Sequence, residues 1–269
     1  MSRHLKDKFP HLETPLIWLD FWDYTQRLFL KGAAIEWLAP AKFDEYYRQI
    51  LGLLDPAIAP IDLDRVISAY LERNPGMKRS MTYRSRPTYP LKALLGDAGL
   101  RSAIVRLCET TADARKYRPL ALTISAPLAL LNMAQAFANG GTTQQVGDDD
   151  CERAAVYMTD FLGALGQPPR TFILLVDGKS EAASAAYRHA LRPLSNLTQH
   201  MRWHLALATQ AAITDPMTAE LVFTPGGLDG VWSSFPCERN GSAALYAVIP
   251  ADHEPEAVLT TIAALRAHA

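Results

Sequence analysis

A proline divides a long apolar stretch near the middle of the chain, LALTISAPLALLNMAQAF (Leu120–Phe137), into two parts. Pro127 lies near its centre, and proline is tolerated in the first turn of a helix but not in a helix interior. The residue before a proline prefers extended geometry, so the sequence predicts a strand over Leu120–Ala126 and a helix over Leu128–Ala138. A membrane-spanning helix needs about 20 predominantly apolar residues, which this interrupted stretch with its polar second half does not supply. The stretch therefore predicts a buried strand that leads directly into a helix.

Short apolar runs of this kind recur along the chain and alternate with helical patterns. The clearest is TFILLVD (Thr171–Asp177), whose apolar core is typical of a strand buried on both faces. Further candidate strands are PLIWLDF (Pro15–Phe21), PAIAPID (Pro56–Asp62), RWHLALAT (Arg202–Thr209), AELVFT (Ala219–Thr224), GVWSSF (Gly230–Phe235) and AALYAVIP (Ala243–Pro250). Helices are predicted over Tyr24–Trp37, after the acidic cluster Asp148–Asp150, from Ser180 to about Leu197, and from Pro255 onwards. Strand–helix alternation with continuous apolar strands predicts a parallel sheet covered by helices.

The number of candidate strands favours an α/β fold that is a single (β/α)8 TIM-type barrel over residues 1–269, with residues 1–14 as an N-terminal extension. One connection does not fit this pattern, because AELVFT and GVWSSF are joined by PGGLD alone. Parallel strands need about a dozen or more connecting residues. Either one crossover helix is shortened or missing, or one of these runs is not a barrel strand. An open sheet is the alternative, because Pro56 and Pro60 weaken the second candidate strand.

The composition narrows the class of partner. The 269-residue chain is 49% hydrophobic and 20% charged, with a formal net charge of −1, which is typical of a soluble globular protein. It gives no electrostatic reason to expect nucleic acid or an anionic membrane surface as a partner. The three cysteines, Cys108, Cys151 and Cys237, are far apart, which suits a reducing compartment and supplies no zinc-ligand cluster. The N-terminus has no apolar core of the kind that a signal peptide needs, so we expect a cytoplasmic protein.

In a barrel of this kind, ligand sites lie at the carboxyl ends of the strands, and this rule selects candidate catalytic residues. Asp177 is the strongest, because a carboxylate directly after an apolar strand is partly desolvated and suits general acid–base catalysis. The alternative is that Asp177 caps the following helix or pairs with Lys179. Asp20 and Tyr246 lie near the ends of other candidate strands and are candidates for the same chemistry.

The same rule selects residues that would bind a substrate. They are Ser125, Asn132, His204 and Gln210. His204 lies early in its strand, where the alternative is a core histidine that donates to a backbone carbonyl. Asp62 and Asp64 form an Asp-x-Asp pair after the second candidate strand, but Asp64 is more simply explained as a helix N-cap than as a metal ligand.

The segment MKRSMTYRSRPTYP (Met77–Pro90) is the one basic segment of the sequence. Its arginines offer bidentate recognition of carboxylates or phosphates, and its tyrosines add stacking faces. Arg79, Arg84 and Arg86 are therefore candidate substrate-binding residues on a loop that would cover the barrel mouth. The alternative is a solvated loop balanced by surface acids.

Several pieces of the sequence carry a resemblance to a known superfamily. A strand ends in an Ala-Pro step before an apolar helix start (ISAPLALLNMAQAFANG), acidic residues open a long helix (Asp149–Leu165), FILLVD ends at Asp177, and LYAVIPAD precedes the last helix. From about Leu91 to Ala264 this order resembles the superfamily that contains uroporphyrinogen decarboxylase, the cobalamin-independent methionine synthases and the corrinoid-linked methyltransferases. The resemblance implies a single (β/α)8 barrel.

The departures from that superfamily concern its metal site. His204-Leu205-Ala206 stands where the zinc-dependent branch has His-x-Cys, and the strand that should end in a carboxylate ends in Thr224. A zinc ion that activates a thiol needs three protein ligands and an open position, so we expect no metal. The residues predict no cofactor, while the resemblance leaves open a folate or corrinoid methyl donor and either a homodimer or a corrinoid-protein partner.

The sequence therefore predicts a metal-independent enzyme that acts on a small carboxylated or heterocyclic compound by acid–base chemistry. The resemblance implies decarboxylation or methyl transfer and does not decide between them. The alternative is a non-catalytic or partner-dependent ligand-binding barrel that has lost the ancestral metal site.

Overall fold

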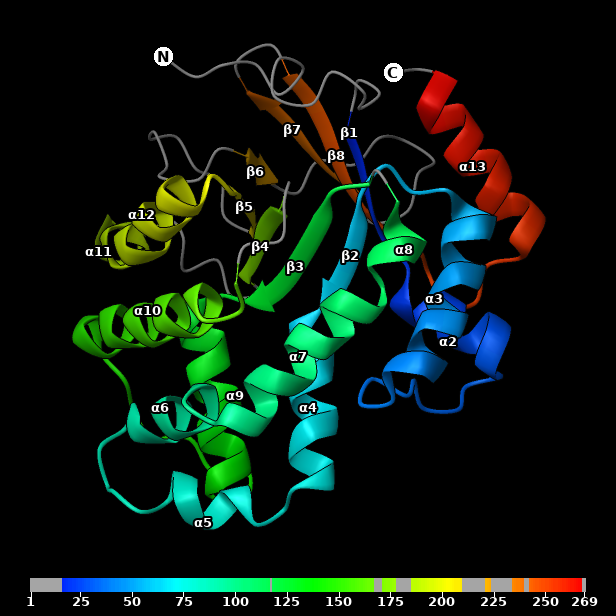
Figure 1. The fold of residues 1–269 in the computed structure, drawn as a ribbon. Helices are drawn as coiled ribbons and strands as arrows, with labels where there is room; N and C mark the ends of the chain where they lie inside the picture. Colours follow the sequence, from blue (N-terminus) through cyan, green and yellow to red (C-terminus); the bar gives the residue numbers. More distant parts are fainter. Residues whose placement is uncertain are drawn as a thin grey trace.

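The computed structural model describes residues 16–116, 118–166, 171–177, 185–209, 221–223, 234–239 and 242–267 of the chain. Its described part is an α/β structure with two sheets and helices around them (Figure 1). The α/β class that the sequence predicts is confirmed, and most strand pairs are parallel. Among these residues, no helix is long and apolar enough to cross a membrane.

The larger sheet contains five parallel strands in the order β2-β3-β4-β5-β6. These strands are β2 (Ala59–Asp62), β3 (Leu120–Ser125), β4 (Thr171–Asp177), β5 (His204–Thr209) and β6 (Leu221–Phe223). The register pairs Asp62 with Thr123 and Ser125 with Val176. Polar residues at the carboxyl ends of neighbouring strands therefore lie along one edge of this sheet.

The smaller sheet contains β1 (Leu16–Asp20), β8 (Ser242–Val248) and β7 (Ser234–Arg239), with β8 in the middle. β1 and β8 are parallel, whereas β7 runs antiparallel to β8. The expectation of uniformly parallel strands is therefore wrong for β7. The last two residues of the strand predicted over Gly230–Phe235 belong to β7, and residues 230–233 lie outside the described part of the chain. The physical reason is the length of the connection: the few residues between β7 and β8 allow a hairpin but not a crossover helix.

The inward faces of the two sheets share one apolar cluster. Side chains alternate between the two faces of a strand, and in β4 this places Phe172 and Leu174 in the inner cluster and Ile173 and Leu175 against the helices. Trp18 of β1 lies edge-on to Phe172, with ring centroids 5.9 Å apart, although the two strands belong to different sheets. The inner cluster thus joins the two sheets across the interior.

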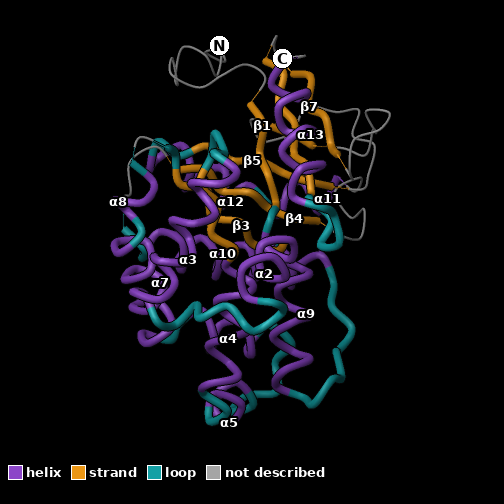
Figure 2. Tube along the Cα trace, turned by 90° about the vertical axis from the view of Figure 1, so that its right-hand side faces the viewer, coloured by secondary structure: helices purple, strands orange, loops and turns teal. Residues whose placement is uncertain are grey.

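Helices cover the outer faces of the sheets and extend beyond their carboxyl ends. They are α2 (Trp22–Leu30), α3 (Pro40–Leu54), α4 (Leu63–Arg73), α5 (Met77–Met81), α6 (Tyr89–Leu95), α7 (Ala98–Thr110), α8 (Ala112–Arg115), α9 (Pro127–Ala138), α10 (Asp148–Gly163), α11 (Ala185–Ala190), α12 (Arg192–Met201) and α13 (Pro255–Ala267). Figure 2 shows the strands in the upper part of the molecule and α4, α5 and α9 below them. The chain between β2 and β3 therefore builds a helical layer at the strand ends.

Most predicted helix starts are confirmed. α13 begins at Pro255 as predicted, and α9 begins at Pro127, one residue before its predicted start. α10 begins at Asp148, so it includes the acidic cluster instead of following it. The helix predicted over Tyr24–Trp37 is wrong in its extent, because α2 ends at Leu30 where Lys31 takes a left-handed conformation. Where one helix was predicted from Ser180 to about Leu197, the described residues form α11 and α12.

A second apolar cluster, larger than the inner one, packs the helices on the sheets. It includes residues from β1 to α13, among them Ile17, Phe43, Leu122 and Ile262. The single domain over residues 1–269 stays a prediction, and its N-terminal extension, residues 1–14, lies outside the described residues.

Candidate functional site

A small polar pocket lies where β1, β2, β3 and β8 approach one another. It is lined by Trp18, Leu19, Asp20, Trp22, Pro60, Asp62, Thr123 and Tyr246. Asp20 and Asp62 are the last residues of their strands, so the pocket lies at the carboxyl ends of β1 and β2. It has room for about one water molecule. The pocket therefore accepts a reacting group of a ligand rather than a whole ligand.

Asp20 and Tyr246 form a hydrogen-bonded pair in this pocket. The Tyr246 hydroxyl donates to Asp20 Oδ2 at 3.0 Å, and the backbone amide of Trp22 approaches Asp20 Oδ1 at 3.4 Å. Burial raises the pKa of Asp20, an effect that the bond from Tyr246 opposes. Burial and the neighbouring Asp20 raise the pKa of Tyr246 well above its ordinary value, so the phenol keeps its proton. Tyr246 can therefore donate a hydrogen bond, and Asp20 can accept one.

Asp62 joins strand β2 to helix α4 and is the N-cap of that helix. Its Oδ1 accepts from the Arg65 backbone amide at 3.2 Å, and its Oδ2 accepts from Arg65 Nε at 3.1 Å. The sequence-based assignment of the N-cap to Asp64 is therefore wrong by two residues. Burial and the nearby Asp64 carboxylate raise the pKa of Asp62 to about 7. At neutral pH this carboxyl group exists in both protonation states, which is what an acid–base catalyst requires.

Asp64 lies in the first turn of α4 and is held by Ser125 at the end of β3. The Ser125 hydroxyl donates to Asp64 Oδ2 at 2.6 Å, and the Ser125 backbone amide donates to the same oxygen at 2.9 Å. Burial raises the pKa of Asp64, and both bonds from Ser125 oppose this shift. Ser125 is thus brought to the carboxyl end of the sheet as predicted, where it positions a carboxylate.

Arg65 places a positive charge beside the carboxylates of Asp62 and Asp23. Its Nη2 lies 2.9 Å from Asp23 Oδ1, and its Nε is bonded to Asp62. The Arg65 side chain is 31% exposed, so solvent or a ligand can reach the guanidinium. Because a guanidinium has five N–H donors, Arg65 keeps donors for an anionic group beside the pocket.

Asp177, the strongest sequence candidate, lies elsewhere. It is 3% exposed at the end of β4 and accepts a hydrogen bond from Thr209 at 3.2 Å. It shares its face of β4 with Ile173 and Leu175, which pack against the helices, whereas Phe172 and Leu174 face the interior. The structure therefore brings Asp20 and Tyr246 together and places Asp177 on the other face of the sheet.

Among the residues that the structure describes, the remaining predicted substrate-binding residues lie on different elements and do not line the pocket. His204 begins β5, and its ring packs on Phe172 with centroids 5.0 Å apart, at the amino end of the sheet. Asn132 lies half-buried on α9. Gln210 lies outside the described residues.

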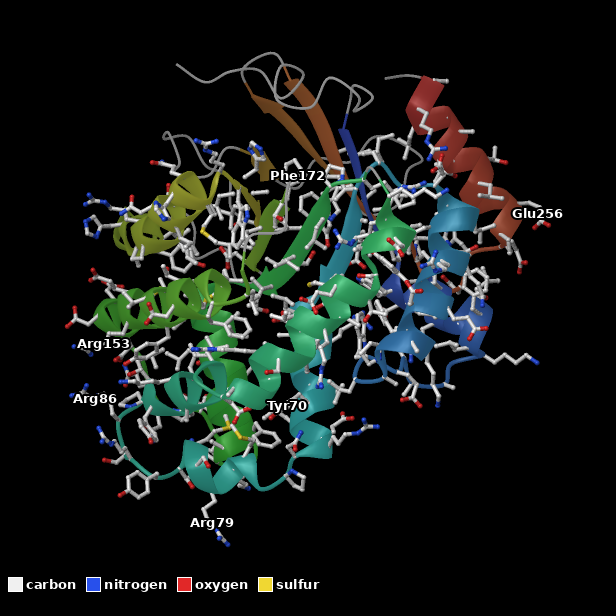
Figure 3. All side chains as sticks on the ribbon, in the orientation of Figure 1. Tyr70, Arg79, Arg86, Arg153, Phe172 and Glu256 are labelled. Carbon is white, nitrogen blue, oxygen red and sulfur yellow. The ribbon has the colours of Figure 1, made fainter. Side chains whose placement is uncertain are left out.

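The basic segment does not cover the pocket. Its first part forms the short helix α5, and Arg79, Arg84 and Arg86 are exposed. Figure 3 shows Arg79 at the end of the molecule opposite the strands, and Arg86 pointing outward on another side. None of these arginines lines the pocket at Asp20 and Asp62.

Sequence reasoning undervalued the Asp62-Leu63-Asp64-Arg65 segment. The signal was present, because two acids and a base follow a candidate strand and begin a helix. The two prolines of PAIAPID weaken the prediction of a strand there. The sequence assigns the N-cap to Asp64, which leaves Asp62 outside the predicted site residues. Within the described ranges no group of histidine, cysteine and acidic side chains is arranged to hold a metal ion.

Comparisons with known proteins give no further information on this site. No family model, no curated protein and no solved structure matches the chain.

Proposed function

We propose that this protein is a metal-independent acid–base enzyme that acts on a small carboxylated compound, with Asp62, Asp20 and Tyr246 as its catalytic residues. The observation that carries the proposal is the meeting of two strand ends, Asp20 and Asp62, with Tyr246 of β8 in one pocket, where the half-buried carboxyl group of Asp62 has a pKa of about 7. Such perturbed groups in a pocket are typical of catalytic sites. The nearby Tyr246–Asp20 pair supplies a hydrogen-bond donor and a carboxylate acceptor.

Decarboxylation uses these residues more completely than methyl transfer. When the bond between carbon and carboxylate breaks, carbon dioxide leaves and its electron pair stays on the substrate carbon. Protonated Asp62 then gives its proton to that carbon and recovers one from solvent. Arg65, with guanidinium donors left over from its two ion pairs, would hold an anionic group of the substrate at the pocket rim.

The proposed scaffold is a closed (β/α)8-like barrel of the uroporphyrinogen decarboxylase and methionine synthase superfamily, with β7 reversed. Two observations support it: the two sheets share one inner apolar cluster, and the described strands follow the order that the resemblance implies. The ends of β1 and β2 also meet around one pocket beside Tyr246 of β8, as strand ends do at a barrel mouth.

A non-catalytic ligand-binding barrel is the second candidate function. The pocket admits only about one water-sized group, which favours binding of a ligand by its tip without enclosing it. In this case Asp62 and Arg65 would recognise the ligand without moving a proton to carbon.

Solvent-deuterium incorporation distinguishes the two. The protein is incubated with a metabolite extract in heavy water, and mass spectrometry identifies compounds that lose carbon dioxide or gain carbon-bound deuterium. Wild-type protein should produce such compounds. The Asp62→Asn variant should do so about 10²–10⁴-fold more slowly, which is the usual contribution of a general acid.

The Asp62→Asn substitution should preserve the fold, and Asp177→Asn serves as its control. Asparagine is as good an N-cap as aspartate, so α4 should keep its start. Asp177→Asn, which changes another buried carboxylate at a strand end, should leave the rate unchanged. If Asp62→Asn and wild type incorporate deuterium equally, or neither does, the catalytic proposal fails.

A further inference from the structure

A basic surface stands apart from the pocket, at the far end of the helical layer. We call it the basic tip and define it as Lys78, Arg79, Tyr83, Arg84 and Arg86. All of these side chains are exposed, and Tyr83, at 78%, is the most exposed of the large hydrophobic residues that the structure describes. The tip is separate from the residues that line the pocket, so its role does not depend on the proposed reaction.

The base of the tip is held firmly by buried residues. Gln135 of α9 is fully buried, and its Nε2 donates to the Pro87 carbonyl at 3.0 Å. Its Oε1 accepts from the Gln144 backbone amide at 2.7 Å, so one side chain fixes the tip and the α9–α10 connection together. Met81 is also completely buried within the same segment. The fold therefore presents the cations on an ordered base, which reduces the entropy lost when a partner binds.

The charges of the tip are not neutralised within the described part of the chain. Elsewhere on the surface, arginines have acidic partners, as in Arg48–Asp44 and Arg153–Asp150. For the four cations of the tip, no acidic side chain lies within ion-pair distance among the residues that the structure describes. Arg84 instead lies over the ring of Tyr89, 5.5 Å from its centroid.

The cations do not converge on a single point. In Figure 3, Arg79 and Arg86 point away from each other on different sides of the helical layer. A single small anion cannot contact both side chains, whereas an extended anionic partner can. The divergence therefore favours a macromolecule over a small ligand.

We propose that the basic tip is a docking surface for an acidic segment of a partner protein. Arginine and tyrosine, which make up most of the tip, are the side chains enriched at the energetic centres of protein–protein interfaces. A membrane surface is disfavoured, because Tyr83 is the only large hydrophobic side chain that the described tip exposes for insertion. Nucleic acid is disfavoured, because the chain as a whole has a net charge of −1.

Fluorescence anisotropy with two labelled peptides tests this proposal. One probe is a decaglutamate peptide, and the other is the same peptide with a phenylalanine in place of one central glutamate. Arg84→Glu/Arg86→Glu should weaken binding of both peptides roughly tenfold or more, because the interaction becomes repulsive. Tyr83→Ala should weaken only the phenylalanine peptide, by about fivefold.

A matched control variant distinguishes the effect of the tip residues from the effect of net charge. Lys31→Glu/Arg106→Glu makes the same change in net charge at two exposed positions outside the tip, and should alter binding by less than about twofold. The proposal is overturned if neither peptide binds, or if the tip and control variants weaken binding equally. It is also overturned if a DNA duplex or phosphatidylserine vesicles bind the tip more tightly than the peptides, since the partner would then be another polyanion.

Discussion

Two carboxylates, the half-buried Asp62 and the buried Asp177, end two strands of the same parallel sheet, and the structure gives them different surroundings. Asp62 ends β2 beside Asp20 and Tyr246, which come from two strands of the other sheet. Asp177 ends β4 and bonds to Thr209 on the adjacent strand, on the face that packs against the helices. Both follow apolar strands, but only Asp62 lines the pocket.

The difference shows that a position at the end of a strand does not by itself place a carboxylate in the pocket. The face of the strand decides whether the side chain enters the interior or the layer between sheet and helices. On the inner face, several strands bring polar groups to one point, and each group alters the pKa of the next. Asp62 therefore has the environment of an acid–base group.

The largest expected effect that tests this difference is a change of stability with pH. Burial raises the pKa of Asp62 from its ordinary 3.8 to about 7. Between these values the folded protein keeps a proton that the unfolded chain has released, so the free energy of unfolding falls as the pH rises. Over the whole window the Asp62 contribution amounts to about 4 kcal/mol. Urea unfolding of wild type and Asp62→Asn from pH 4 to pH 8 measures it.

The Asp62→Asn variant cannot release this proton. Its stability relative to wild type should therefore rise between pH 4 and pH 7 and then stay constant, because Asp62 is ionised in both states above that window. Contributions from Asp20 and Asp64, whose pKa values burial also raises, remain in both proteins. Two parallel stability curves would show instead that Asp62 titrates normally.

A smaller effect is expected when the pair at the pocket is broken. Tyr246→Phe removes the donor to Asp20 Oδ2 and leaves a half-buried carboxylate with fewer partners. We expect a loss of about 1.5–3 kcal/mol in the free energy of unfolding near neutral pH, since bonds to charged groups are the stronger ones. Urea unfolding measures this loss.

Tyr47→Phe provides the matched control for this change. Tyr47 is also a buried tyrosine, but its hydroxyl donates to the neutral Pro60 carbonyl at 2.7 Å. Its loss should be about 0.5–1.5 kcal/mol. Equal losses in the two variants would indicate that Asp20 is not ionised, and the pocket would then lack its proton acceptor.

The sequence predicts local features of this fold well and the site less well. Pro127 determines the boundary between β3 and α9, because proline acts on its own residue and the one before it. The face of Asp177 could not be predicted in this way, because TFILLVD is apolar on both faces and alternation gives no signal. The convergence of Asp20, Asp62 and Tyr246 depends on three strands from distant parts of the chain, and no local pattern encodes it.

Two hydroxyl groups allow the two faces of the sheet to be compared more finely. Ser125→Ala removes the hydroxyl bond to Asp64 but keeps the bond from the backbone amide, while Thr209→Val removes the hydroxyl bond to Asp177. The bond from Ser125 lowers the pKa of Asp64, so it stabilises the ionised form. The loss in Ser125→Ala should therefore be about 1 kcal/mol at neutral pH and diminish as the pH falls and Asp64 becomes protonated. A loss that is independent of pH in urea unfolding would argue that Ser125 acts only through packing.

The smallest expected effect concerns the rim of the pocket. Asp23 is paired with Arg65 at 2.9 Å, but its side chain is 65% exposed. Because solvent screens such pairs, Asp23→Asn should change the free energy of unfolding by less than about 0.5 kcal/mol, and 0.5 M sodium chloride should remove even this difference. The same substitution frees a further donor of Arg65, so a substrate anion should bind no less tightly than in wild type. A larger loss that persists in high salt would mean that Arg65 is held as rigidly as the buried groups. It could not then turn toward a ligand, and the anion would have to be bound by another residue.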